Sequence, residues 1–172
     1  TFPSATVFAG GEATREAFLQ KAGKADLLEV AAHAVYVPEN PMLSYLQFGG
    51  IPKGELFPAF AEERVTLYDV LGLQLNAAVA TLSACETGLA DPEGADGLAG
   101  MHRAFLTAGA QSVVSSLWRV SDLTSGVLMK NFHRNLKAHD PATALRDAQL
   151  KVMKYFPHPA YWAGFRLDGL SR

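Results

Sequence analysis

Residues 81–88 read Thr-Leu-Ser-Ala-Cys-Glu-Thr-Gly and contain the single cysteine of the 172-residue chain. The segment that leads into the cysteine, residues 78–83, is short, apolar and partly β-branched, which is typical of a buried strand in a parallel sheet. Because open α/β sheets bind ligands outside the carboxyl ends of their strands, we expect Cys85 to be presented to a substrate. The alternative is that Cys85 is a small buried hydrophobic residue.

A second apolar segment, residues 27–32, leads in the same way into His33. Cys85 follows His33 by 85 − 33 = 52 residues, close to the separation of about 50 residues between the histidine and the cysteine of caspases. We therefore expect the two side chains to meet at the ends of neighbouring strands. A histidine at such a position also occurs as a hydrogen-bonded structural residue, and only its pairing with Cys85 favours a catalytic role.

The composition bounds the class of protein. At 18.5 kDa and 49% hydrophobic residues, the chain suits one compact domain over residues 1–172. A net charge of −2 without a basic run argues against a nucleic-acid partner. A lone cysteine excludes an internal disulfide framework and predicts a reducing, cytoplasmic location. No apolar stretch reaches the roughly 18 residues of a membrane span. Because the chain starts without methionine, we expect it to be part of a longer protein.

Hydrophobic periodicity and turn residues predict alternating strands and helices, and therefore a layered α/β fold with a mostly parallel sheet. The strands are expected at residues 5–9, 27–32, 78–83, 112–118 and about 164–167, with a hairpin between 45–48 and 64–66. The helices are expected over about ten residues after Gly10-Gly11, at 66–71, at 97–108, from Ser121 or Asp122 to about Lys137, and after Asp140-Pro141.

Several side chains are assigned to the core. They are Phe18, Leu19 and Ala22 on the first helix; Leu98, Met101, Phe105 and Ala108 on the third; Leu145, Ala148, Val152 and Tyr155 on the last; and the aromatic residues Trp118, Tyr161, Trp162 and Phe165. The remaining histidines, His102, His133, His139 and His158, have no metal-ligand spacing. Without such spacing, and without a nucleotide-binding glycine motif, we expect neither a metal nor a cofactor.

Residues 34–64 are rich in proline and glycine and leave directly from the candidate histidine. Loops of this length in compact domains are commonly functional or disordered. Two interpretations stay open here, a wall of the substrate groove and a plain surface insertion.

A series of ordered motifs resembles the CHAT domain, a branch of the caspase-like cysteine proteases related to separase. They are Ala-Ala-His-Ala at 31–34, Pro-Met-Leu-Ser at 41–44, Thr-Leu-Tyr-Asp at 66–69, Leu-Ser-Ala-Cys-Glu-Thr-Gly at 82–88, the glycine- and alanine-rich segment 94–110, Ser-Leu-Trp-Arg-Val-Ser-Asp at 116–122, the helical segment 144–149 and Tyr-Trp-Ala-Gly-Phe at 161–165. The resemblance implies a caspase-like layered fold. It also implies that the rest of the protein supplies a further N-terminal strand and helix, and commonly helical repeats that regulate the domain.

The activity implied by the resemblance is that of a cysteine endopeptidase. Cys85 would attack a peptide carbonyl as the thiolate, and His33 would take its proton and pass one to the leaving amine. The backbone N–H groups of Ala34 and Cys85 would hold the oxyanion, each contributing roughly 3 kcal/mol. Relatives usually carry glycine at the position of Ala34, so an added Cβ there puts the orientation of this donor in question.

Specificity is implied by Asp122, which matches the separase-like acidic residue that receives a basic side chain. We expect arginine to be preferred over lysine before the cleaved bond, because its planar guanidinium meets a carboxylate with two hydrogen bonds. The alternative role of Asp122 is a helix cap. Asp91, Glu93 and Asp96 either add negative field or form a solvated loop. Two further functions stay open: a protease-like interaction module without activity, and a domain that binds a small molecule in an apolar pocket.

Overall fold

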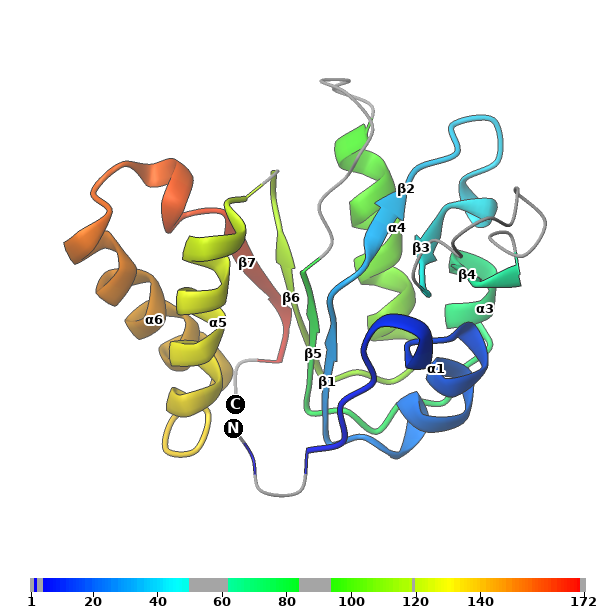
Figure 1. Ribbon diagram of the computed structural model, residues 1–172, viewed down its shortest axis with the longest axis horizontal. Helices are drawn as coiled ribbons and strands as arrows, with labels where there is room; N and C mark the ends of the chain where they lie inside the picture. The colour runs from blue at the N-terminus through cyan, green and yellow to red at the C-terminus, as the bar shows by residue number, and fades with distance from the viewer. Residues whose placement is uncertain (1, 3–4, 50–61, 84–93, 119, 171–172) are drawn as a thin grey trace.

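The computed structural model describes residues 2, 5–49, 62–83, 94–118 and 120–170. Within these ranges a four-stranded sheet has the order β1-β5-β6-β7, formed by Leu27–Val30, Val79–Leu82, Ser112–Ser116 and Phe165–Gly169 (Figure 1). β1, β5 and β6 run parallel, and β7 pairs with β6 in the opposite direction. The predicted α/β fold with a mostly parallel sheet is confirmed.

The central strands are buried because helices cover both of their faces. Every residue of β5 and of β6 is buried, as expected for parallel strands between two helical layers. β1 lies at the edge of the sheet and is only partly buried. The two segments predicted from their apolar sequences to be neighbouring strands, β1 and β5, pair in register with Val30 opposite Leu82.

Helices lie on the two sides of this sheet (Figure 1). α5, Asp122–Asn135, and α6, Pro141–Tyr155, pack against each other on one side. On the other side lie α1, Arg15–Lys21, α3, Leu67–Leu71, and α4, Gly94–Thr107. In the described residues, short 3₁₀ turns connect the elements at Gly10–Glu12, Ala22–Lys24, Pro41–Leu43 and Pro159–Tyr161.

Each helical layer has its own hydrophobic core, and we name the two after α4 and α5. The α4 core includes Phe18, Leu46, Val65, Val70 and Phe105. The α5 core includes Val114, Leu128, Phe132, Ala148 and Val152. The sheet separates them, with neighbouring β5 residues divided between the two, Ala80 in the α4 core and Val79 in the α5 core.

A second, small antiparallel sheet has the order β2-β3-β4, formed by His33–Val35, Tyr45–Gln47 and Arg64–Thr66. The predicted hairpin between 45–48 and 64–66 is therefore present, and it has a third strand that begins at the candidate histidine. The buried residues Ala34, Leu46 and Val65 lie opposite one another across this sheet and pack into the α4 core.

Helix termini follow the capping rules that the sequence predicts. Thr66 and Asp69 form a reciprocal capping box at α3. Asp140 accepts the backbone N–H of Thr143 at α6, and its pKa is lowered by this hydrogen bond. Gly109, expected to end α4, has φ of 116° and follows that helix.

Several expectations are wrong. Residues 5–9 do not form a strand and are exposed, because no neighbouring strand pairs with them in the part of the chain that the structure describes. The first helix starts only at Arg15, after the Thr14 cap. Tyr155 was expected inward, but its side chain points to solvent and is 74% exposed. Of the four aromatic residues assigned to the core, Phe165 is buried and Trp162 packs against the α5 core, whereas Trp118 and Tyr161 are 41% and 42% exposed.

Across the described residues, no helix combines the length and the apolar character that crossing a membrane requires.

Candidate active site

The carboxyl ends of three parallel strands lie side by side at one edge of the main sheet. Val30, Leu82 and Ser115 are aligned across β1, β5 and β6. Past the end of β5, the backbone N–H of Ser83 donates to the Val30 carbonyl over 2.9 Å. The chain segments that leave β1 and β5 therefore begin from adjacent points, which is the position where open α/β sheets bind ligands.

His33 lies three residues after Val30 and begins β2. Its side chain is exposed, so it is available to a substrate rather than packed in the core. Within the described ranges the imidazole makes no hydrogen bond or ion pair. The other member of the predicted pair, Cys85, lies outside the described residues, as do Asp91 and Glu93. β5 ends three residues before Cys85.

Ala34 is part of strand β2 and pairs with Leu46 of β3. Its side chain is buried in the α4 core. A strand residue has negative φ, which alanine adopts as readily as other residues. The methyl group that distinguishes Ala34 from the usual glycine therefore packs inward and does not require a strained backbone.

Asp122 is the first residue of α5, and Ser121 before it is the N-cap. The Asp122 carboxylate is exposed and, in the described part of the chain, makes no side-chain hydrogen bond or ion pair. Its negative charge lies at the N-terminus of the helix, where the helix dipole stabilises anions, but it is not the capping residue. Ser121 occupies the N-cap position, but its side chain makes no capping hydrogen bond. The alternative role of Asp122 as the helix cap is therefore not observed.

Gly164 lies against residues that precede Asp122 in the sequence. The backbone N–H of Leu117 donates to the Gly164 carbonyl over 2.7 Å. A Cβ at Gly164 would lie 2.5 Å from Val120 Cγ1 and 3.2 Å from Trp118 Nε1. The close approach requires glycine at this position and constrains where Trp118 and Val120 lie.

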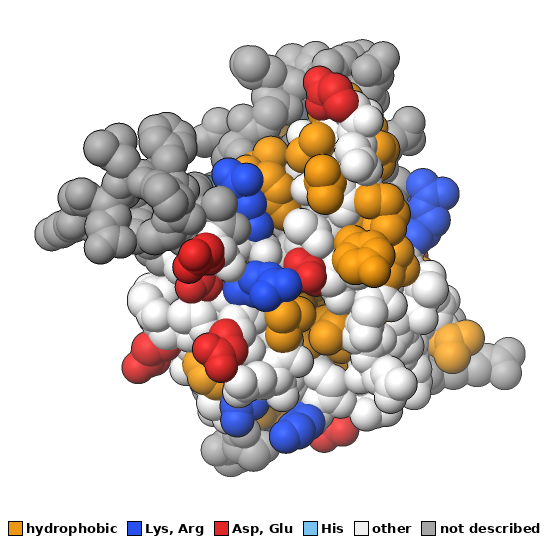
Figure 2. All heavy atoms as spheres, turned by 90° about the vertical axis from the view of Figure 1, so that its right-hand side faces the viewer, with side chains coloured by type: hydrophobic (Ala, Val, Ile, Leu, Met, Phe, Trp, Pro, Cys, Tyr) orange, Lys and Arg blue, Asp and Glu red, His pale blue; other side chains and the backbone are white. Residues whose placement is uncertain are grey.

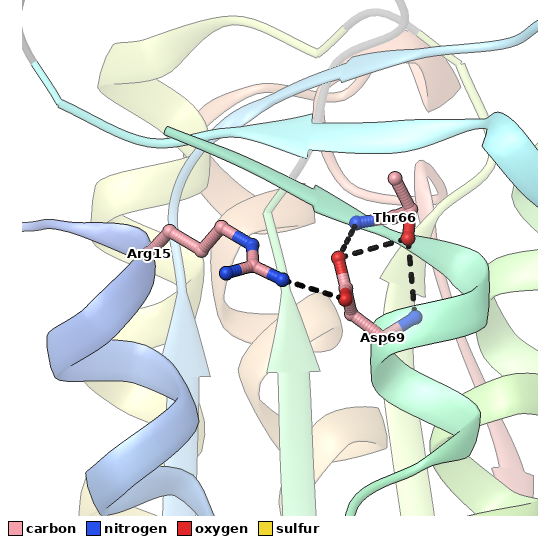
Figure 3. Close-up of polar contacts among 3 residues, drawn as sticks. All are labelled: Arg15, Thr66 and Asp69. Carbon is pink, nitrogen blue, oxygen red and sulfur yellow. Dashed lines mark hydrogen bonds and ion pairs between the residues drawn. The ribbon is translucent and has the colours of Figure 1, made fainter. Parts of the chain in front are cut away.

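A polar cluster beside the small sheet was not predicted from the sequence (Figure 3). Arg15 Nη2 donates to Asp69 Oδ1 over 2.8 Å, and Asp69 Oδ2 accepts the backbone N–H and the hydroxyl of Thr66 at 2.9 and 2.8 Å. Burial opposes ionisation of Asp69, but the hydrogen bonds from Thr66 and Arg15 outweigh it and lower the pKa of the carboxyl. The sequence indicates only the capping part of this cluster, because Arg15 lies 54 residues away.

The face of the molecule that carries α1 and α3 has a mixed surface. Charged side chains of both signs lie among hydrophobic ones there (Figure 2). The exposed hydrophobic residues of this region include Met42, Leu43 and Tyr68. The part of this face that the structure describes therefore has no extended surface of one charge.

Metal ligands would require a close group of histidine, cysteine or carboxylate side chains. The described residues contain no group of three or more such side chains in a suitable arrangement. The buried His102 of α4 faces Asp168 of β7 at 4.0 Å, which is too long for a hydrogen bond.

Comparison with known proteins identifies the family. The CHAT domain family profile matches residues 1–170. The chain belongs to the CHAT domain family. Two relatives are both called Tetratricopeptide repeat protein 28. The human protein is 37% identical over 115 residues, which are 65% of this chain and 5% of the relative. The mouse protein is 36% identical over 115 residues, again 65% of this chain and 5% of the relative.

This CHAT domain chain thus spans about a twentieth of the length of these two relatives. CHAT domains are a caspase-like family, and the mixed α/β architecture with its mostly parallel sheet and two helical layers agrees with that class. The resemblance inferred from the ordered motifs is confirmed at the level of the family.

Proposed function

We propose that this CHAT domain is a cysteine endopeptidase in which Cys85 is the nucleophile and His33 is the general base. The observation that carries the proposal is the adjacent origin of the two segments that contain these residues. Ser83 and Val30 are joined by a 2.9 Å backbone hydrogen bond, and His33 follows Val30 by three residues on the same edge of the sheet. Cys85 is two residues beyond Ser83 in the sequence.

The chemistry needs a thiolate beside a base. His33 would remove the proton of Cys85, the sulfur would attack the peptide carbonyl carbon, and the imidazolium would protonate the departing amine. Water would then hydrolyse the thioester with His33 as the base. The exposure of His33 supports this role, because the imidazole must reach both the thiol and the substrate.

The oxyanion would be held by the backbone N–H groups of Ala34 and Cys85. The strand conformation and inward methyl group of Ala34 support the view that alanine does not obstruct this arrangement. Neither a cofactor nor a metal is needed for the reaction.

Specificity for arginine before the cleaved bond is proposed for Asp122. It begins α5 directly after the segment that leaves β6, and β6 lies next to β5. Its exposed carboxylate, without a partner in the described part of the chain, is free to receive a guanidinium. Protein or peptide chains would be the substrates.

Regulation by a helical-repeat region upstream is proposed from the names of the two relatives, which are tetratricopeptide repeat proteins. Such a region would recruit substrates or receive the activating signal. A cytoplasmic location is proposed from the single cysteine, which suits a reducing compartment.

The test is cleavage of fluorogenic peptides that end in Arg, Lys, Asp or Leu before the reporter. Cys85→Ala is expected to reduce cleavage to background, and His33→Ala is expected to lower kcat by about 10²- to 10⁴-fold. His139→Ala, which removes an exposed histidine, is the matched control. Cleavage that persists in Cys85→Ala would exclude this residue as the nucleophile.

The specificity is tested separately with Asp122→Asn. Loss of the charged partner should reduce kcat/KM for the arginine peptide by about ten- to a hundredfold and leave the leucine peptide unchanged. Asp26→Asn, at the opposite end of the sheet before β1, is the control. Preferred cleavage after Asp would retain the dyad and reject the Asp122 assignment.

A second candidate function is an inactive, protease-like interaction module. It is favoured by the absence, within the described residues, of any group that orients the His33 imidazole, because catalytic histidines are commonly held in one tautomer by a partner. A thiol-directed peptide with an arginine end separates the two functions. Labelling of Cys85 at neutral pH supports the protease, and no labelling supports the module.

A further inference from the structure

Carboxylates that precede and follow β4 in the sequence bind the start of helix α1. Before β4, the Glu63 carboxylate accepts the backbone N–H of Arg15 at 2.6 Å. After β4, Asp69 pairs with the Arg15 guanidinium at 2.8 Å. Arg15 thus joins the start of α1 to residues on both sides of the three-residue strand β4. Figure 3 shows the contact with Asp69.

The same region of α1 makes two further contacts with the sheet. The Ala13 carbonyl accepts the backbone N–H of Gly49 at 2.7 Å. The ring of Phe18 lies 5.1 Å from that of Phe48, between centroids. Both contacts fall on Phe48 and Gly49, the two residues that follow β3.

The three paired strands of the small sheet connect these contacts of α1 to the candidate histidine. Thr66 of β4 lies opposite Tyr45 of β3, and Gln47 of β3 lies opposite His33 of β2. Each of the three strands has three residues, so the ladders are short and offer few hydrogen bonds to resist a shift. The buried Gln47 side chain donates to the Phe48 carbonyl at 3.0 Å, which stiffens the residue opposite His33.

We propose that Arg15 is a positioning residue for His33, acting through Asp69 and the β4-β3-β2 sheet. This inference rests on the Cys85–His33 dyad proposed above. The Arg15–Asp69 ion pair holds β4 against α1, and β4 determines where β3 and β2 lie. Release of the pair lets the small sheet move relative to β1 and β5, and the alignment of the imidazole with Cys85 that the proposed dyad requires is lost.

The expected effect is on chemistry rather than on substrate binding. A displacement of about 1 Å caused by a distant substitution can lower the rate up to about a hundredfold. Arg15→Ala should therefore lower kcat by about ten- to a hundredfold while KM stays within about twofold of the wild type, since Arg15 has no place in the proposed substrate pocket.

The decisive measurement is the rate of Cys85 alkylation by iodoacetamide as a function of pH. In the wild type, His33 should keep the thiol reactive well below the ordinary thiol pKa of about 8.5. In His33→Ala the profile should follow a free thiol. Arg15→Ala should shift the profile toward that of His33→Ala, and Arg15→Lys, which keeps a cation near Asp69, should restore much of the wild-type rate.

Two variants separate positioning from a general loss of stability. Asp69→Asn keeps a group that can cap α3 through Thr66 but removes the charge opposite Arg15, so it should reproduce the shifted pH profile with less effect on thermal unfolding. Arg146→Ala removes an exposed arginine that pairs with Asp147 at 2.8 Å on α6, and it should leave the profile unchanged.

The outcomes separate the positioning role of Arg15 from the existence of the dyad. If His33→Ala changes the alkylation profile and Arg15→Ala and Asp69→Asn do not, the positioning role is wrong and the dyad stands. If His33→Ala itself has the wild-type profile, the dyad is wrong, and the positioning role falls with it.

Discussion

The two faces of the main sheet are covered in different ways. On the α5 side, two helices of 14 and 15 residues pack along each other and cover the sheet with aliphatic and aromatic side chains. On the α4 side, the longer α4 is joined by the short helices α1 and α3 and by the small sheet. The first arrangement depends on continuous apolar contact, whereas the second also depends on particular polar contacts such as Arg15–Asp69.

The two sides therefore differ in how strongly they resist displacement. A long amphipathic helix pair resists displacement because many small contacts would have to break together. Each strand of the small sheet contributes one apolar side chain to the α4 core, Ala34, Leu46 and Val65. Fewer contacts therefore oppose its displacement than oppose that of the helix pair. The candidate histidine lies on the second kind of structure, while Asp122 begins one of the long helices.

The sharpest test of the comparison uses two buried phenylalanines. Phe105 and Phe132 are both fully buried, one in each core. Phe105→Ala and Phe132→Ala should each lower the free energy of unfolding by about 3–5 kcal/mol, measured by urea denaturation. Only Phe105→Ala should also slow Cys85 alkylation at a temperature where both variants are folded, because Phe105 lies 6.3 Å from the ring of Phe18 on α1. An equal slowing in Phe132→Ala would remove the proposed division between the two sides.

A smaller effect is expected at the helix caps. Thr66→Ala removes the capping box of α3 and should destabilise the protein by about 1 kcal/mol. It also removes one partner of Asp69, so the alkylation rate should fall. Asp140→Ala, its counterpart at α6, should lower the melting temperature without changing that rate. If both caps alter the rate alike, the α3 cap has no special connection to the site.

Acid should destabilise the protein through His102. Burial lowers the pKa of its imidazole; Asp168 opposes this shift and Arg166 adds to it. The folded state therefore binds the proton less readily than the unfolded state. Stability should be constant above about pH 6.5, the usual histidine pKa, and should decrease as the pH falls below that value.

The measurement is the melting temperature between pH 8 and pH 5, where carboxylates with a lowered pKa, such as Asp69, stay ionised. His102→Gln should flatten the decrease below pH 6.5. His139→Gln, which changes an exposed histidine, should retain the wild-type curve. A wild-type curve in His102→Gln would assign the acid sensitivity to another group, such as His133, whose pKa is also lowered by burial.

The smallest effect is expected for Tyr155→Ala. The side chain is 74% exposed at the end of α6, and substitutions at such positions usually change stability by less than about 0.5 kcal/mol. Val152→Ala, one turn earlier and buried in the α5 core, is the comparison and should cost about 1–3 kcal/mol more. A similar loss for both would mean that Tyr155 packs inward after all.

Local signals were sufficient to predict much of the fold. The apolar runs before His33 and Cys85 predicted β1 and β5, and the Thr66 and Asp140 caps predicted where α3 and α6 start. These features depend on residues close together in the sequence. The ordered motifs also identified the family, which the match over residues 1–170 confirms.

Features that depend on distant partners were predicted less well. Residues 5–9 have the composition of a strand, but a strand requires a neighbour, and the described structure offers none at that place. Tyr155 has the helical spacing of an inward residue, yet it is the last residue of α6 and its side chain is exposed. The Arg15–Asp69 pair links positions 54 residues apart, and no spacing rule could have indicated it. The catalytic assignments of His33, Ala34, Cys85 and Asp122 stay predictions.

Gly164 has a consequence for engineering the specificity proposed for Asp122. Leu117, Trp118 and Val120 lie so close to it that one methyl group would displace Val120 and Trp118. Gly164→Ala would thus act as a wedge beneath these residues, re-aiming the Asp122 carboxylate without replacing it. If Asp122 receives the basic side chain of the substrate as proposed, a library that varied the size of the residue at this single position would alter the distance between carboxylate and substrate while keeping the charge.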